Sequence, residues 1–241
     1  MAEIWAHGVQ YPEEKGIPKR KLSLVPSFLL LLFLLQTKMK LIMKLFGCGF
    51  NSSECKDTVE TVVVKARFLQ KKKQDEVAKM KSDIASRLQA GEDPIASPAH
   101  VLIKRVIREQ NVSVAYEFIE AFCDMVGGRL STIKEVRECP ENLKEGISSL
   151  VFAAKKCSHE IPELVTLKNI FKKKYGKTFV SAATNIRPNC GVDIMMMKKL
   201  ADTNPQGDEK MKIVQEIADK YGIHGSWVEI AGNNCNALVK V

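Results

Sequence analysis

The sequence lacks the closely spaced cysteine and histidine pairs that hold structural zinc. Its seven cysteines are scattered, no two of them have CxxC spacing, and its four histidines are equally dispersed. We therefore expect no metal site. An odd number of scattered thiols is typical of a chain in a reducing cytosol, where most thiols serve as small buried apolar groups.

Motifs of catalysis and of cofactor binding are missing as well. The sequence contains no HExxH and no nucleophile motif. The stretch "GCGFNS" from Gly47 lacks the third glycine of a dinucleotide-binding fingerprint, and no strand pattern precedes it. We therefore predict that the chain is not an enzyme, and that it has no catalytic residue and no cofactor.

A hydrophobic run of membrane-spanning length is also lacking. The longest run, "LSLVPSFLLLLFLL" at residues 22–35, is shorter than the ~20 residues that span a bilayer, and Pro26 interrupts it. The basic residues 19–21 before it suit a signal peptide or a signal anchor. Alternatively, translation naturally starts at Met39 or Met43. We expect residues 1–42 to be an atypical leader, either non-native or a membrane anchor.

The net charge of +9 favours acidic partners, such as a phosphate backbone or anionic lipid. A compact basic recognition helix and interleaved aromatic and basic residues, which nucleic-acid binders use, are both missing. Binding to nucleic acid is therefore not expected. A basic helical nucleic-acid-binding protein and a membrane-anchored adaptor remain the alternative functions.

Helical spacing dominates the rest of the chain, and no alternating strand pattern of useful length occurs. Residues 57–90 contain no proline or glycine, and their apolar residues recur at steps of three and four, which predicts a long amphipathic helix. A second long helix is predicted at 98–135, with Ser97 as its cap and a soft spot at Gly127 and Gly128. The two helices should form an antiparallel hairpin.

Shorter helices are predicted after the hairpin, at 138–157, 162–175, 179–186, 192–202 and 207–223, with Gly176 and Pro188 as stop signals. They should cover the apolar seam of the hairpin. The fold class is therefore all-α, with the helical domain at 43–224 and a short loose tail at 225–241. The residues expected in the core include Leu69, Ile84, Phe118 and Phe122.

Several stretches resemble a known family in their order and spacing: "KQDEVAKMKSDIASRLQAGEDPIA" from Lys73, "VIREQN" from Val106, "ECPENLKEGISSLVFAAKKC" from Glu138, "IPEL" from Ile161, "KKYGKTF" from Lys173 and "RPNCGV" from Arg187. They resemble the increased-sodium-tolerance family (Ist1-like proteins), the ESCRT-III-like regulators of the Vps4 ATPase in the multivesicular body pathway. The amino-acid sequence of these stretches is most similar to that of plant members. Two segments differ from the family pattern: "SPAHVLIKR" replaces a basic start of the second helix, and the tail "GNNCNALVKV" carries no helix for binding the ATPase.

The resemblance implies a non-enzymatic ESCRT-III-like helical scaffold in endosomal protein sorting. Its implied partners are charged multivesicular body proteins, which are ESCRT-III subunits, and a Vps4-type AAA ATPase. The implied location is cytoplasmic and peripheral on endosomes. By this resemblance, the C-terminal helix of a charged multivesicular body protein should dock in a groove between helices. The residues expected to line that groove are Met196, Lys199, Ile213, Ile217 and Tyr221.

A row of lysines marks a second candidate surface on the first helix. Lys65, Lys72 and Lys79 recur every seven residues along one edge, with Lys71 nearby and Phe68 pointing to the same polar side. This surface would contact an acidic membrane or an ESCRT-III polymer, since cations near anionic lipid contribute about 1 kcal/mol each.

The alternative is a solvated face of ion pairs, because three of these four lysines also have an acidic residue four positions ahead. The pairs would be Lys71–Asp75, Lys72–Glu76 and Lys79–Asp83.

Overall fold

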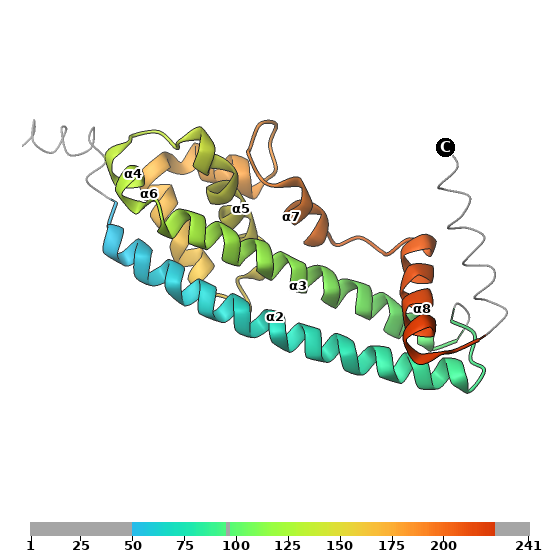
Figure 1. Cartoon of the computed structure of the whole chain (residues 1–241). Coiled ribbons are helices and arrows are strands. Elements are labelled where there is room, and N and C mark those ends of the chain that lie inside the picture. The colour runs from blue at the N-terminus through green and yellow to red at the C-terminus, as the bar shows by residue number, and fades with distance from the viewer. Residues whose placement is uncertain (1–49, 95–96, 225–241) are drawn as a thin grey trace, which may run out of the picture. The chain divides into compact units, whose positions relative to one another are not determined.

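A computed structural model of the chain describes residues 50–94 and 97–224, and these residues contain helices and no strand. Helices α2 (Ser52–Gln89) and α3 (Ala99–Gly127) form the predicted antiparallel hairpin (Figure 1). The shorter helices are α4 (Leu130–Glu135), α5 (Glu141–Cys157), α6 (Glu163–Thr184), α7 (Ile194–Lys199) and α8 (Gly207–Tyr221). The leader predicted at 1–42 and the tail predicted at 225–241 lie outside the described residues.

Capping groups fix where the two long helices begin. The Asn51 side chain accepts hydrogen bonds from the backbone N–H groups of Ser53 and Glu54, so α2 begins five residues earlier than predicted. At the start of α3, the Ser97 hydroxyl oxygen accepts from the N–H of Ala99 at 3.1 Å, as expected of a cap. The predicted helix 98–135 is divided at the glycine pair, because α3 ends at Gly127 and α4 follows from Leu130.

The helix that begins at Glu163 is interrupted at Gly176, where the sequence predicts a stop. Gly176 has φ 92° and ψ 166°, a backbone conformation that side-chain-bearing residues rarely adopt, and helix resumes beyond it. Helix α6 therefore consists of two helical segments that meet at a kink, in agreement with the two helices predicted at 162–175 and 179–186.

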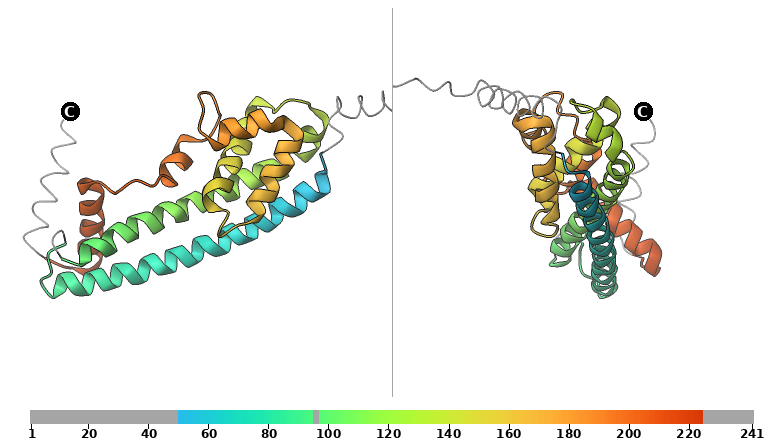
Figure 2. Two further views of the ribbon diagram at one scale, coloured as in Figure 1. Left: turned by 180° about the vertical axis from the view of Figure 1, so that it is seen from behind. Right: turned by 90° about the vertical axis from the view of Figure 1, so that its left-hand side faces the viewer.

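Two separate hydrophobic cores form along the hairpin. The large core is formed by the first half of α2, the second half of α3 and helices α4–α7. The small core is formed by the second half of α2, the first half of α3 and α8. Figure 2 shows α4–α7 gathered over one part of the hairpin and α8 crossing its other end. Of the expected core residues, Ile84 is fully buried in the small core. The other three are only partly buried against the large core: Leu69, Phe118 and Phe122.

The aromatic side chain that α3 buries completely is Tyr116. Burial raises the pKa of Tyr116, so its hydroxyl stays protonated and donates a hydrogen bond to Glu160. Glu160 also contacts Lys73 at 3.5 Å, and Lys73 bonds Glu109 at 2.7 Å. These side chains form a polar layer between the two cores that ties α2 and α3 to the turn before α6.

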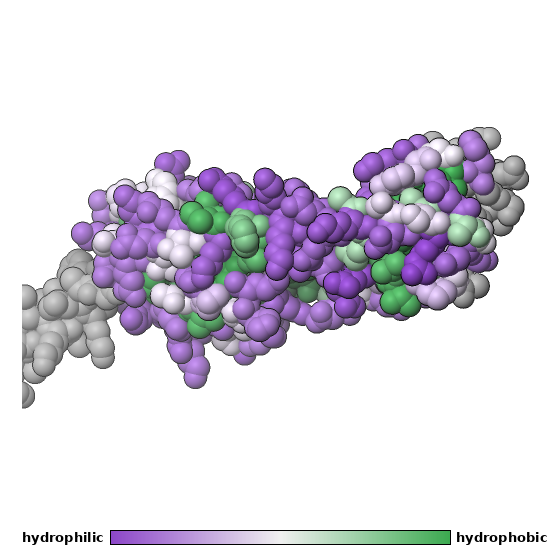
Figure 3. All heavy atoms as spheres, turned by 90° about the horizontal axis from the view of Figure 1, so that it is seen from below, coloured by the Kyte–Doolittle hydropathy of each residue, from purple (hydrophilic) through white to green (hydrophobic). Residues whose placement is uncertain are grey.

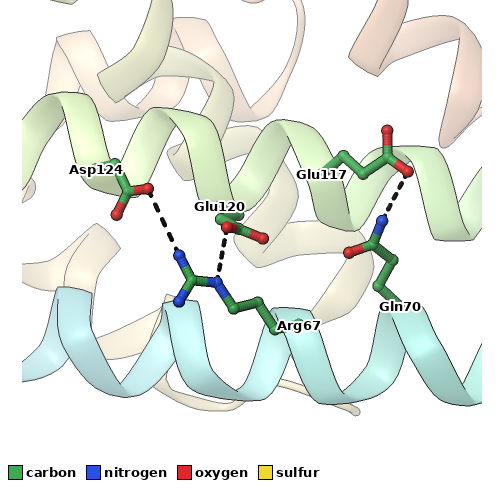
Figure 4. Close-up of polar contacts among 5 residues, drawn as sticks. All are labelled: Arg67, Gln70, Glu117, Glu120 and Asp124. Atoms are coloured by element: carbon green, nitrogen blue, oxygen red, sulfur yellow. Dashed lines mark hydrogen bonds and ion pairs between the residues drawn. The ribbon is translucent and has the colours of Figure 1, made fainter.

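Polar rungs also link the two long helices within the length of the large core. The Arg67 Nε donates to Glu120 at 2.7 Å, its Nη2 lies 4.0 Å from Asp124, and Gln70 donates to Glu117 at 2.7 Å (Figure 4). Since each rung joins a residue of α2 to a defined partner on α3, the rungs fix how the helices align along the hairpin.

Candidate docking site

An open pocket of about 450 Å³ lies between α3, α7 and the linker 200–206 that leads to α8. Four of its lining residues are cationic, and two are acidic. The cations come from three helices: Arg108 on α3, Lys156 at the end of α5, and Lys198 and Lys199 on α7. The acids are Asp202 in the linker and Glu209 in the first turn of α8. The site therefore has a surplus of positive charge and suits a ligand with acidic groups.

Two of the four cations are held by the protein itself. The Lys199 ammonium donates to the Asn111 side-chain oxygen at 2.9 Å, which ties α7 to α3. The Lys156 ammonium lies 2.8 Å from the Asp202 carboxylate. Arg108 and Lys198 have no ion-pair partner among the described residues, so their charges remain available to a ligand.

Two apolar side chains of α7 are exposed, and one of them lines the same pocket. The Asp193 carboxylate caps α7 by accepting from the Met196 N–H at 2.6 Å, and this start directs Met196 into the large core. Ile194 and Met195 therefore point outward, with 63% and 45% of their surface exposed. Met195 lines the pocket beside the cations. Cations and exposed apolar groups in one place are typical of a surface that binds an amphipathic helix.

The groove residues expected from the sequence lie mostly in the cores. Met196 is buried in the large core, while Ile213 and Ile217 are buried in the small core, with Tyr221 packed partly buried against it. Lys199 is the one of the five that lines the open pocket. The five residues therefore do not line one open groove, and we take the neighbouring pocket as the candidate docking site; which residues contact a partner stays a prediction.

Sequence reasoning missed Arg108 and Lys156 as pocket residues. Arg108 belongs to the stretch "VIREQN", one turn before Asn111, and this spacing could have indicated a shared face of the helix. No spacing in the sequence indicates Lys156, because this residue reaches the pocket only through the way α5 packs in the folded protein.

The lysine row is divided in the structure. Lys65 bonds Glu163 at the start of α6 at 2.6 Å, and this hydrogen bond is the main reason why the pKa of the Glu163 carboxyl is lowered. The other three lysines, Lys71, Lys72 and Lys79, are exposed. None of these three has an ion-pair partner within the described part of the chain, so the i,i+4 pairs of the alternative interpretation do not form.

Two apolar side chains stand on the same outer face of α2. Val64 and Phe68, one turn apart, are 67% and 69% exposed. Seen from below, the side on which α2 lies in Figure 1, the surface is mostly hydrophilic with small hydrophobic spots (Figure 3). We use the term "α2 outer face" for five residues: Val64, Phe68, Lys71, Lys72 and Lys79.

Three of the five described thiols are small buried groups, and the other two, Cys139 and Cys190, are partly exposed. Cys55, Cys123 and Cys157 are buried, and burial raises the pKa of Cys55 and of Cys157 to about 12. Such thiols stay protonated near neutral pH and are poor nucleophiles. Within residues 50–94 and 97–224, no cluster of histidine, cysteine and acidic side chains suits a metal ion, and no helix is long and apolar enough to cross a membrane.

Comparison with protein families gives a match over residues 56–224, to the family described as "Ist1: Regulator of Vps4 activity in the MVB pathway". The chain belongs to the Ist1 family. The family resemblance read from the sequence is thereby confirmed, and the matched residues lie within the domain predicted at 43–224.

Two individual proteins are similar to the chain. An IST1-like protein of Dictyostelium discoideum is 27% identical over 178 residues, which are 74% of this chain and 47% of the relative. The chain thus spans about half the length of that relative. The N-terminal domain of Saccharomyces cerevisiae Ist1, solved in complex with a Did2 MIM motif, superposes with a TM-score of 0.65 at 21% identity, covering 73% of this chain and 94% of the yeast chain. This likeness confirms the all-α, ESCRT-III-like fold.

Proposed function

We propose that the protein is a non-catalytic scaffold that binds charged multivesicular body proteins and modulates the disassembly of ESCRT-III by a Vps4-type ATPase. The Ist1 family regulates Vps4 activity in the multivesicular body pathway. The observation that carries the binding step is the pocket between α3, α7 and the linker, where unpaired cations adjoin exposed apolar side chains. We further propose a cytoplasmic, peripheral location on endosomes, where such subunits assemble.

The pocket suits the C-terminal helix of an ESCRT-III subunit for two reasons. An amphipathic helix could place its apolar face on Ile194 and Met195, which are already exposed. Acidic side chains along its edge could meet Arg108 and Lys198, which have no ion-pair partner among the described residues. Complementary charge of this kind directs the partner and raises the rate of association. In support, the yeast Ist1 domain of the same fold was solved with a MIM motif of Did2.

Titration calorimetry with the full chain tests this proposal. The ligand is a synthetic peptide of the C-terminal helix of a Did2-type ESCRT-III subunit. Arg108→Glu should weaken binding by about fivefold or more, because reversal replaces an attraction with a repulsion. Arg105→Glu is the matched control, since Arg105 is exposed on the same helix but does not line the pocket. Absence of binding, or equal weakening by both variants, would overturn the proposal.

A second candidate function, contact with acidic membrane, rests on the α2 outer face. Phe68 is 69% exposed beside three unpaired lysines, a combination that a solvated ion-paired face does not explain. Aromatic side chains sit well at a membrane interface, and each nearby cation contributes about 1 kcal/mol toward anionic lipid.

Co-sedimentation with acidic liposomes tests this second function. Changing Lys71, Lys72 and Lys79 together to glutamate should abolish pelleting and leave the fold intact. Lys65 is kept, because it pairs with Glu163. The control is a matched triple reversal on exposed positions of α6: Lys172, Lys173 and Lys177. Added salt should also weaken pelleting of the wild type, since exposed charges are screened beyond about 8 Å at physiological ionic strength. If both triple variants pellet like the wild type, the α2 outer face does not bind membrane.

A further inference from the structure

The linker 200–206 forms one wall of the pocket and carries an acid into it. Leu200 anchors the linker at one end in the large core, and helix α8 begins at Gly207 on the other. Between these ends, Asp202 bonds Lys156 across the pocket at 2.8 Å. The linker therefore contacts the cationic wall through an acidic side chain. Acidic side chains are also what we expect a partner to bring to this wall.

Asp202 interacts with two of the pocket's cations. Its pKa is lowered chiefly by the hydrogen bond from Lys156, and the charges of Lys156 and Arg108 act in the same direction. The two cations come from different helices, α5 and α3, so the carboxylate stands where positive charge from two walls converges. Even so, the Asp202 side chain is 94% exposed. An ion pair so open to water is weak and readily exchanged for another.

We propose that Asp202 is an internal substitute for an acidic side chain of the docking helix, and that the partner must displace it from Lys156 to bind fully. This inference rests on the proposed function of the pocket. The occupant is a carboxylate carried on an amphipathic helix rather than a free anion, because the exposed Met195 beside the cations, and its exposed neighbour Ile194, offer nothing to a small anion. Such a helix would use the apolar and the cationic parts of the site together.

Displacement requires little rearrangement. Asp202 lies in a segment without helix, and its side chain has no other bond to the rest of the described protein besides that to Lys156. Lys199, held by Asn111, keeps α7 in place when the linker moves. The linker thus lowers the affinity of the pocket without closing it, and discriminates against helices that lack an acid at the matching position.

Calorimetry with full-length variants tests the inference with the same ESCRT-III peptide. Asp202→Asn removes the competing charge and should tighten binding by about two- to fivefold, the range expected for loss of an exposed ion pair. Asp208→Asn is the matched control, because Asp208 is an exposed acid close in sequence that does not line the pocket. A peptide whose acids are changed to their amides should bind both Asp202→Asn and wild type equally, since it has no charge to compete.

The outcomes separate the two proposals. If the peptide binds the wild type and Asp202→Asn with equal affinity, the internal competition is disproved while docking stands. A gain of equal size in Asp208→Asn would also disprove it, because net charge alone would then account for the change. If the peptide binds neither wild type nor Asp202→Asn, docking at this pocket fails, and the inference fails with it.

Discussion

The two cores of the hairpin differ in how many elements hold them. Around the large core, helices α4, α5, α6 and α7 all pack on the hairpin, whereas among the described residues the small core is closed by α8 and by Ile223 just beyond it. The buried contribution of α8 consists of four side chains: Ile213, Val214, Ile217 and Ala218. A unit held by so few apolar contacts should open at a lower free energy than the rest of the protein.

The polar layer around Lys73 separates the two cores. Lys73 and Glu109 each have 15% of their side-chain surface exposed, so their ion pair is partly removed from water. The pocket is lined in part by the linker that connects a large-core helix, α7, to the small-core helix, α8. The difference between the cores therefore concerns the docking site as well. The linker that lines the pocket joins the large-core unit to the unit that we expect to open at a lower free energy.

The largest effect should come from the large core. Phe171 on α6 is fully buried there, and Phe171→Ala should lower the free energy of unfolding by about 3–5 kcal/mol, through lost transfer energy and the cavity left behind. Chemical denaturation followed by circular dichroism measures this change. A loss below about 1 kcal/mol would show that the large core is not the main source of stability.

A comparable truncation in the small core should act locally. Ile217→Ala should cost about 2 kcal/mol or more, but the cost should appear as undocking of α8 rather than unfolding of the domain. Hydrogen exchange should then lose protection in α8 and in the adjacent ends of α2 and α3, and keep it in α5. Equal loss of protection in α5 and α8 would mean that the two cores open as one unit.

Breaking the polar layer should have a smaller effect. Lys73→Met leaves Glu109 and Glu160 without their cation and should cost about 1–3 kcal/mol at neutral pH. Desolvation opposes the charge of Lys73, but the bond to Glu109 and the nearby acids outweigh it, so the pKa of Lys73 is raised. The contribution of the Lys73 charge to stability is therefore fully present below the pKa that lysine has in the unfolded chain. It is lost as the pH rises through the pKa that Lys73 has in the folded protein.

The deficit of Lys73→Met should therefore shrink above about pH 10.4, the ordinary lysine pKa. Denaturation curves of variant and wild type at neutral and alkaline pH measure it. A deficit that stays constant over this range would show that the Lys73 charge is not responsible.

The smallest effect is expected at the pair between α2 and α6. Glu163→Gln removes the partner of Lys65 and should cost a few tenths to about 1 kcal/mol at neutral pH, as for other partly exposed pairs. The lowered pKa of Glu163 means that this contribution is present at neutral pH and is lost as the pH falls through the folded value. Variant and wild type should therefore converge in stability as the pH falls below the usual pKa of a glutamate carboxyl, and a difference that grows on acidification would refute this assignment.

Spacing in the sequence was enough to predict the hairpin but not which aromatics are buried. A single stripe on α3 favours Phe118 and Phe122, but α3 packs against both α2 and α5, so its buried arc is wider than one stripe. The two phenylalanines stack on each other at the edge of this arc, with 6.2 Å between ring centroids. Tyr116 was missed because the partner of its buried hydroxyl, Glu160, lies far away in the sequence.

The pocket that we propose as the docking site includes part of the region that the sequence indicated, but of the five expected residues only Lys199 lines it. Helical periodicity does not show whether an apolar face meets the protein or a partner, and Met196, Ile213 and Ile217 all meet the protein. The pocket itself depends on how α7 and the linker pass over α3, which is a matter of tertiary packing. The lysine row was visible as a pattern, but the bond from Lys65 to Glu163 on another helix was not.

The most direct test of the account is a nuclear magnetic resonance titration of the full chain with the ESCRT-III peptide. We predict that backbone signals of Arg108, Met195, Lys199 and Asp202 shift in proportion to occupancy, while those of Lys79 on the α2 outer face stay in place. Shifts confined to residues outside the pocket, or no shift at any peptide concentration, would contradict the proposal that the protein binds ESCRT-III helices between α3, α7 and the linker.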